Sequence, residues 1–137
     1  MLLVTLGVPL AAAAAALAVD AAVEAGQPLI VANVVELPPL AMSVRLGYDQ
    51  LPDPVVDETL RDAAALAVSL GVRVERLRVK SPRPLPALLD LIAEREPGLL
   101  VFGPDRSKIK PRAFRKTAKK IRSRATCLVW TADEAVS

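Results

Sequence analysis

Histidine is absent from the 137-residue sequence, which removes the commonest general base and the commonest metal ligand of proteins. Because no other catalytic constellation is evident, we expect a protein that is not an enzyme and has neither a metal nor a resident cofactor. The single cysteine, Cys127, excludes a disulfide framework, as in a reducing cytoplasm. Cys127 lies in an apolar run, residues 126–130, and this predicts a buried thiol rather than a reactive one.

Aromatic residues are also scarce, at 3%, whereas hydrophobic residues make up 53% of the chain. The core must therefore consist mainly of Ala, Val and Leu, and such small side chains suit helices packed closely on a sheet. A chain of this length buries roughly two thirds of its unfolded surface without disulfides or metals. We expect a single domain over residues 1–137.

Positive charge is missing from the beginning of the chain, where no Lys or Arg precedes Arg45. A secretory signal normally begins with such a residue. The uncharged stretch 2–19 is interrupted by Gly7, Val8 and Pro9, which favours a short strand and a helix over a membrane-spanning segment. We therefore predict a cytoplasmic protein with no membrane span.

Charge is unevenly distributed although the net charge is only +3. Residues 1–105 carry 8 basic and 13 acidic side chains, and residues 106–137 carry 10 basic and 2 acidic ones. The last part of the chain should therefore attract anions. The modest net charge argues against a dedicated nucleic-acid-binding protein.

Hydrophobic periodicity predicts alternating strands and helices. Five apolar or alternating runs read as strands, at residues 2–6, 29–35, 72–80, 98–102 and 126–131. Four segments have helical spacing, at residues 10–25, 54–70, 85–96 and 111–124. This alternation with right-handed crossovers predicts an α/β protein with a doubly wound five-stranded parallel sheet and helices on both faces.

Several local signals refine this outline. Asp53 followed by Pro54 predicts a helix start, and Asp57 with Arg61 should form an i,i+4 ion pair. A phase slip between Val74 and Leu77 suggests a bulge in that strand. The Pro-rich connection 36–52 reads as a surface excursion or a functional lid.

The segment PGLLVFGPDRSKIKPRAFRKTAKKIRSRATCLVW, residues 97–130, resembles the last third of the universal stress protein family. That family has glycine, two residues, glycine, nine residues, then glycine with Ser or Thr between its fourth strand and fourth helix. Here the spacing is kept, since Gly103 is followed by Arg106, nine residues and then Lys116 with Thr117. Gly103 and Thr117 match the family, whereas Arg106 and Lys116 replace glycines.

At the other end of the chain, Gly7 aligns with a family Asp that helps to hold adenosine. The resemblance implies an adenine-nucleotide alpha hydrolase-like fold with strand order 3-2-1-4-5. It also implies that ATP binding is weakened or lost, because Arg106 and Lys116 would obstruct a backbone phosphate cradle.

The same substitutions supply cations for a compact anion. The candidate ligand is a weakly bound nucleotide, phosphate or sulfate. By motif position, the candidate binding residues are Gly7, Gly103, Arg106, Ser107, Lys108, Lys116 and Thr117.

Helix 111–124 is expected to bury one face and expose a basic one. The buried set comprises Phe114, Thr117, Ala118, Ile121 and Ala125, and the exposed cations are Arg112, Arg115, Lys116, Lys119, Lys120, Arg122 and Arg124. Three readings of the basic face stay open: solvated surface, a site for a small phosphorylated or acidic ligand, and a contact for an acidic macromolecule or anionic membrane. Nucleic acid is unlikely, because no exposed aromatic residue is interleaved for base stacking.

Three functions follow from these observations. We expect a regulatory or binding protein related to stress, with weakened ATP binding. The alternatives are an ATP-binding universal stress protein and an electrostatic adaptor for nucleic acid or another polyanion. The resemblance further implies a homodimer through the uncharged edge strand 126–131, with Trp130 at the interface. A receiver-like or flavin-binding fold has the same element order, but residues 7 and 8 lack a receiver's acidic cluster.

Overall fold

The computed structural model describes residues 1–37 and 53–131. Five parallel strands form one sheet in the order β3-β2-β1-β4-β5, which confirms the predicted α/β class and strand order. The strands are β1 (Leu2–Thr5), β2 (Leu29–Glu36), β3 (Val74–Ser81), β4 (Leu99–Phe102) and β5 (Leu128–Thr131). The helices are α1 (Ala12–Ala25), α3 (Pro54–Ser69), α4 (Pro84–Arg95) and α5 (Pro111–Arg124).

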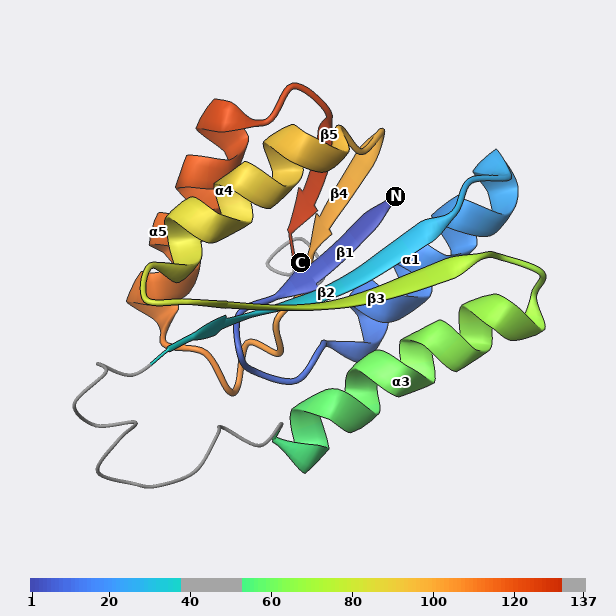
Figure 1. Cartoon of the computed structure of the whole chain (residues 1–137), viewed down its shortest axis with the longest axis horizontal. Helices are drawn as coiled ribbons and strands as arrows, with labels where there is room; N and C mark the ends of the chain where they lie inside the picture. The colour runs from blue at the N-terminus through green and yellow to red at the C-terminus, as the bar shows by residue number, and fades with distance from the viewer. Residues whose placement is uncertain (38–52, 132–137) are drawn as a thin grey trace.

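Helices cover both faces of the sheet (Figure 1). Apolar residues of α1 and α3 pack against one face, and apolar residues of α4 and α5 pack against the other. On α1 the contact is made largely by buried alanines, which are Ala14, Ala18 and Ala22. The expected core of small side chains is therefore confirmed, and short side chains let α1 approach the sheet closely.

The second core contains two of the few aromatic rings. Phe102 at the end of β4 stacks on Phe114 of α5 with ring centroids 5.4 Å apart. Both rings are buried, and this pair fixes the first turns of α5 over the carboxyl end of β4. The predicted inner face of α5 is confirmed, with Ala125 only partly buried.

The predicted bulge in β3 is wrong. Every residue of β3 pairs in register with β2, from Val74 opposite Leu29 to Ser81 opposite Glu36. Val74 packs on the α1 and α3 side, whereas Leu77 and Val79 pack on the α4 and α5 side. Successive strand residues face opposite sides. The phase slip therefore arises because apolar residues of β3 pack on both faces of the sheet, while the pairing of β3 with β2 is unbroken.

The local signals around α3 are confirmed. Asp53 caps the helix, because its Oδ1 accepts hydrogen bonds from the amides of Val55 at 2.9 Å and Val56 at 3.5 Å. The Arg61 Nε lies 3.3 Å from the Asp57 carboxylate. Most of the connection 36–52 lies outside the described residues, so neither reading of it is tested.

The last strand begins later than predicted, at Leu128. Cys127 therefore precedes the strand, is only partly buried and is a free thiol, so the prediction of a fully buried thiol is wrong. The reason is that β5 is an edge strand with a neighbour on one side only, and its first residue, Leu128, is 75% exposed. None of the helices in the described segments is long and apolar enough to cross a membrane.

Candidate functional site: the loops that follow strands β1 and β4

The loops after β1 and β4 meet at the centre of the sheet, where the strand order reverses. Ligands of open α/β sheets usually bind at this point. Here direct hydrogen bonds join the two loops: the Asp105 amide donates to the Pro9 carbonyl and the Ala11 amide donates to the Gly103 carbonyl, both at 2.8 Å. Leu10 and Pro104 form an isolated antiparallel bridge between these bonds. Helix α1 consequently begins at Ala12 rather than at Leu10.

Three polar side chains hold the β1–α1 loop. Asn33 of β2 accepts a hydrogen bond from the Gly7 amide at 2.8 Å. The Thr5 hydroxyl donates to the Val8 carbonyl at 2.8 Å, and the Thr59 hydroxyl of α3 accepts from the Leu10 amide at 3.0 Å. This set of three side chains was not predicted from the sequence. Its one available signal was Asn33, the only amide side chain in the apolar run 29–35.

Gly7 adopts a φ of +69°, in the region that favours glycine. Because Gly7 has no side chain and its amide is bonded to Asn33, this position offers no carboxylate that could contact an adenosine.

Gly103 has a packing role that the motif did not reveal. A Cβ at this buried position would overlap the Cβ of Ala14 and would lie 3.4 Å from the Leu3 Cδ1. The Gly103 amide donates to the Val4 carbonyl at 2.9 Å. Glycine is therefore required here by the close approach of the loop to α1, irrespective of any ligand.

Asp105 accepts hydrogen bonds from residues that follow it in the same loop. Its Oδ1 accepts hydrogen bonds from the Ser107 hydroxyl at 2.7 Å and from the Ser107 amide at 3.0 Å. Its carbonyl accepts from the Lys108 amide at 2.9 Å. The Ser107 hydroxyl, followed by the Ser107 amide and the Lys108 charge, lowers the pKa of Asp105 from the ordinary value of 3.8, while partial desolvation opposes the shift.

Asp105 was not among the predicted site residues, although Asp is a common turn residue because its side chain accepts a hydrogen bond from the backbone amide two residues later. The loop therefore contains a carboxylate that occupies the donor groups of Ser107.

Arg106 stacks on an aromatic ring. Its guanidinium carbon lies 4.0 Å from the centroid of the Phe114 ring, a cation–π contact. Within the described segments, no carboxylate pairs with this guanidinium.

Lys116 and Thr117 are separated from the loop by the first turn of α5. Lys116 is exposed, whereas Thr117 is on the inner face and only 4% exposed. The structure thus gathers Gly103, Arg106, Ser107 and Lys108 in one loop, beside the loop of Gly7. Among the described residues, neither Lys116 nor Thr117 forms a side-chain hydrogen bond or an ion pair with that loop.

The start of α5 carries positive potential. Lys110 precedes the helix without a side-chain cap, Pro111 occupies its first turn, and that turn contains no acidic residue. The seven predicted outward cations of α5 are all exposed. Unbonded amides of a first helical turn add to such a potential.

Known structures share this fold. A universal stress protein from Burkholderia pseudomallei is 21% identical, covers 93% of each chain and has a TM-score of 0.58. The Archaeoglobus fulgidus universal stress protein in complex with dAMP is 19% identical over 96% of each chain, with a TM-score of 0.64. A universal stress protein in complex with cAMP is 22% identical over 96% of this chain and 94% of the other, with a TM-score of 0.58.

No curated protein sequence matches the chain significantly. The universal stress protein family itself matches residues 1–132, which is nearly the whole sequence. The sheet order and the position of the two loops agree with that match. This chain therefore belongs to the universal stress protein family.

Proposed function

We propose that this chain is a non-enzymatic regulatory or binding module of the cytoplasm, related to stress, in which ATP binding is weakened or lost and the β4–α5 loop with α5 attracts anions. The observation that carries the proposal is the Asp105 carboxylate, which accepts both the amide and the hydroxyl of Ser107. A negative charge at this position repels a nucleotide phosphate and competes with it for the same donors.

The backbone of the loops supports weak nucleotide binding. The amides of Gly103, Asp105, Ser107 and Lys108 all donate to protein oxygen atoms. The Gly7 amide donates to Asn33. A phosphate would have to displace these bonds before it could be held by backbone amides, and each displaced bond lowers its affinity.

Nucleotide binding is the second candidate function, because two of the similar structures hold dAMP and cAMP. Their likeness to this chain shows the fold alone. Arg106, Lys108 and the start of α5 supply charge that favours a compact anion such as phosphate or sulfate. The bonds from Ser107 lower the pKa of the Asp105 carboxyl, which makes this carboxylate a weaker base and favours a function in binding over hydrolysis.

Calorimetric titration at moderate salt separates the two functions. We expect ATP to bind with a dissociation constant above about 1 µM and with no preference over pyrophosphate. The reason is that two charge-assisted hydrogen bonds of roughly 1.5–3 kcal/mol each are lost, which reduces the affinity by about two to four orders of magnitude. Micromolar or tighter ATP binding with clear preference over pyrophosphate contradicts the proposal. Combined substitution Gly7→Asp, Val8→Gly, Arg106→Gly and Lys116→Gly should increase ATP affinity if the side chains are responsible.

The module is proposed to be a homodimer through β5. This edge strand is uncharged, Leu128 is 75% exposed and Trp130 is partly exposed. Exposed apolar strand edges readily pair with one another. Sedimentation at tens of micromolar, roughly the range for a non-obligate dimer, should show a dimer that Leu128→Lys dissociates. A monomeric wild-type chain refutes this assembly.

A further inference from the structure

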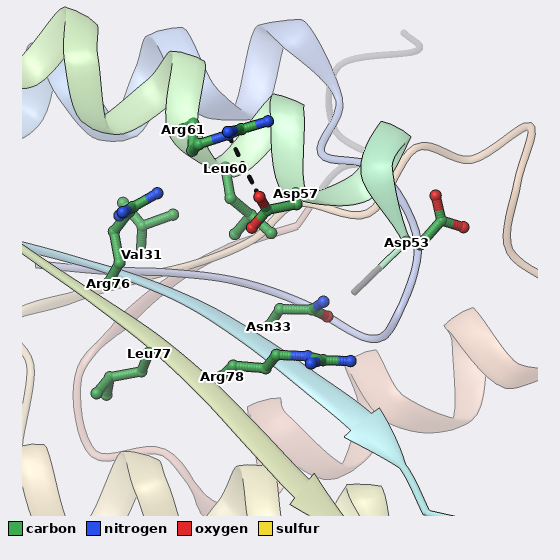
Figure 2. A pocket seen from close by; sticks show the side chains of 9 residues that line it. All are labelled: Val31, Asn33, Asp53, Asp57, Leu60, Arg61, Arg76, Leu77 and Arg78. Atoms are coloured by element: carbon green, nitrogen blue, oxygen red, sulfur yellow. Dashed lines mark ion pairs between the residues drawn. The ribbon is translucent and has the colours of Figure 1, made fainter. Parts of the chain in front are cut away.

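A pocket of about 470 Å³ lies between helix α3 and the β2–β3 edge of the sheet (Figure 2). One wall consists of strand residues and the opposite wall of residues in the first two turns of α3. Its lining includes no residue of β1, β4 or their loops. The pocket is therefore distinct from the two loops of the candidate site, although it shares Asn33 with the network that holds the β1–α1 loop.

Register explains why polar groups gather on the strand wall. Val31 pairs with Arg76, and Asn33 pairs with Arg78. Since alternate residues of a strand share one face, Arg76 and Arg78 lie on the same side of β3 as Val74, which packs towards α1 and α3. Both guanidinium groups consequently border the pocket (Figure 2).

Asn33 provides a fixed donor. This residue is only 8% exposed, and its Oδ1 accepts the Gly7 amide, which determines the orientation of the side-chain amide. The Nδ2 group makes no hydrogen bond with any described residue and borders the pocket. A donor that is held in this way loses little conformational entropy when it binds a ligand.

The charged side chains that border the pocket have donor and acceptor atoms available for a ligand. Within the described part of the chain, no carboxylate forms an ion pair with Arg76 or Arg78. Asp53 uses Oδ1 to cap α3, which leaves Oδ2 available. Asp57 uses Oδ2 for Arg61, which leaves Oδ1 available. The pocket therefore offers guanidinium and amide donors together with carboxylate acceptors.

Edge protection is the simplest alternative explanation for Arg76 and Arg78. Charged side chains on an edge strand prevent pairing with another chain. That role would be met equally by Lys80, which lies on the same face of β3 and does not border the pocket. It does not account for the Asn33 amide or for the carboxylates of Asp53 and Asp57, which border the same pocket.

We infer that this pocket binds a phosphorylated polyol, such as a sugar phosphate. Arg76 and Arg78 bind the phosphate group, because guanidinium groups form paired hydrogen bonds with phosphate oxygens. The free oxygens of Asp53 and Asp57 accept hydrogen bonds from hydroxyl groups, and Asn33 Nδ2 donates to a hydroxyl or ring oxygen. The volume lies within the usual range for small-ligand sites of about 300–1,000 Å³.

Titration of the ¹⁵N-labelled full chain with glucose 6-phosphate, ribose 5-phosphate and glycerol 3-phosphate tests this inference. We expect saturable shifts of the Asn33 side-chain amide and of the backbone amides of Arg76 and Arg78. Arg76→Ala and Arg78→Ala should each weaken binding by about tenfold to a hundredfold, the effect of one charge-assisted hydrogen bond. Lys80→Ala removes a cation from the same strand face outside the pocket and should change affinity less than about twofold.

Four outcomes overturn the inference. The first is no shift of Asn33 with any of the three compounds up to about 10 mM, beyond which affinity is negligible. The second is equal weakening by Lys80→Ala, which indicates attraction to general positive charge. The third is binding of inorganic phosphate as tight as that of the sugar phosphates, which removes the role of the carboxylates. The fourth is a shift confined to the amides of α5.

Discussion

Gly103→Ala tests the packing of the β4–α5 loop against α1. The added Cβ overlaps Ala14 Cβ and lies 3.4 Å from Leu3 Cδ1. Ala14 is fully buried in the α1 core, so the overlap cannot be relieved by a flexible side chain. We expect a loss of about 1–3 kcal/mol from overpacking, offset by about 0.4–1 kcal/mol because alanine restricts the unfolded chain.

Urea unfolding followed by circular dichroism measures this loss. With a slope of about 2 kcal/mol per molar urea, in the middle of the usual range, a net change of about 1–2 kcal/mol shifts the midpoint to lower urea by roughly 0.5–1 M. Gly98→Ala is the matched control, because a Cβ there meets no described atom within 4 Å. Its midpoint should stay the same or rise slightly.

A double-mutant cycle tests whether the overlap with Ala14 causes the loss of stability in Gly103→Ala. Ala14→Gly alone costs about 1 kcal/mol as a glycine within a helix, but in the Gly103→Ala background it removes the overlapping atom. We therefore expect a favourable coupling of at least about 1 kcal/mol between the two positions. If Gly103→Ala unfolds at the same urea concentration as Gly98→Ala, or if the cycle shows no coupling, the packing explanation is refuted.

Two further changes test the loop networks. Asn33→Ala removes the side-chain acceptor of the Gly7 amide. Because Gly7 is itself exposed, we expect the loss of one ordinary hydrogen bond, about 0.5–1.5 kcal/mol of the free energy of unfolding. Glu36→Ala on the exposed end of β2 should change the free energy of unfolding by less than about 0.5 kcal/mol. The lowered pKa of Asp105 means that its ionised form stabilises the fold above the unfolded-state pKa of 3.8, and that this contribution is lost as pH falls through the folded-state pKa. Acid titration of Asp105→Asn should therefore show a shallower stability loss below about pH 4 than wild type, and parallel curves would contradict the loop geometry.

The sequence determined the order of elements because each depends on local pattern. Apolar runs specified the buried strands, Asp53 with Pro54 specified the start of α3, and the 3.6-residue spacing specified the inner face of α5. These elements need only short-range information, so they could be predicted without coordinates. The strand order came from the resemblance of residues 97–130 to the universal stress protein family, because a local pattern does not encode it.

Tertiary contact decided what the individual site residues do. Gly103 faces Ala14, Arg106 lies on Phe114, and Asn33 reaches the Gly7 amide from a strand that is distant in sequence. Such pairings depend on the register and closeness of packed elements, which a local pattern does not encode. The same reason explains the error in β3: spacing revealed two apolar phases, but only the two-sided core showed that Val74 and Leu77 serve opposite faces of an unbroken strand.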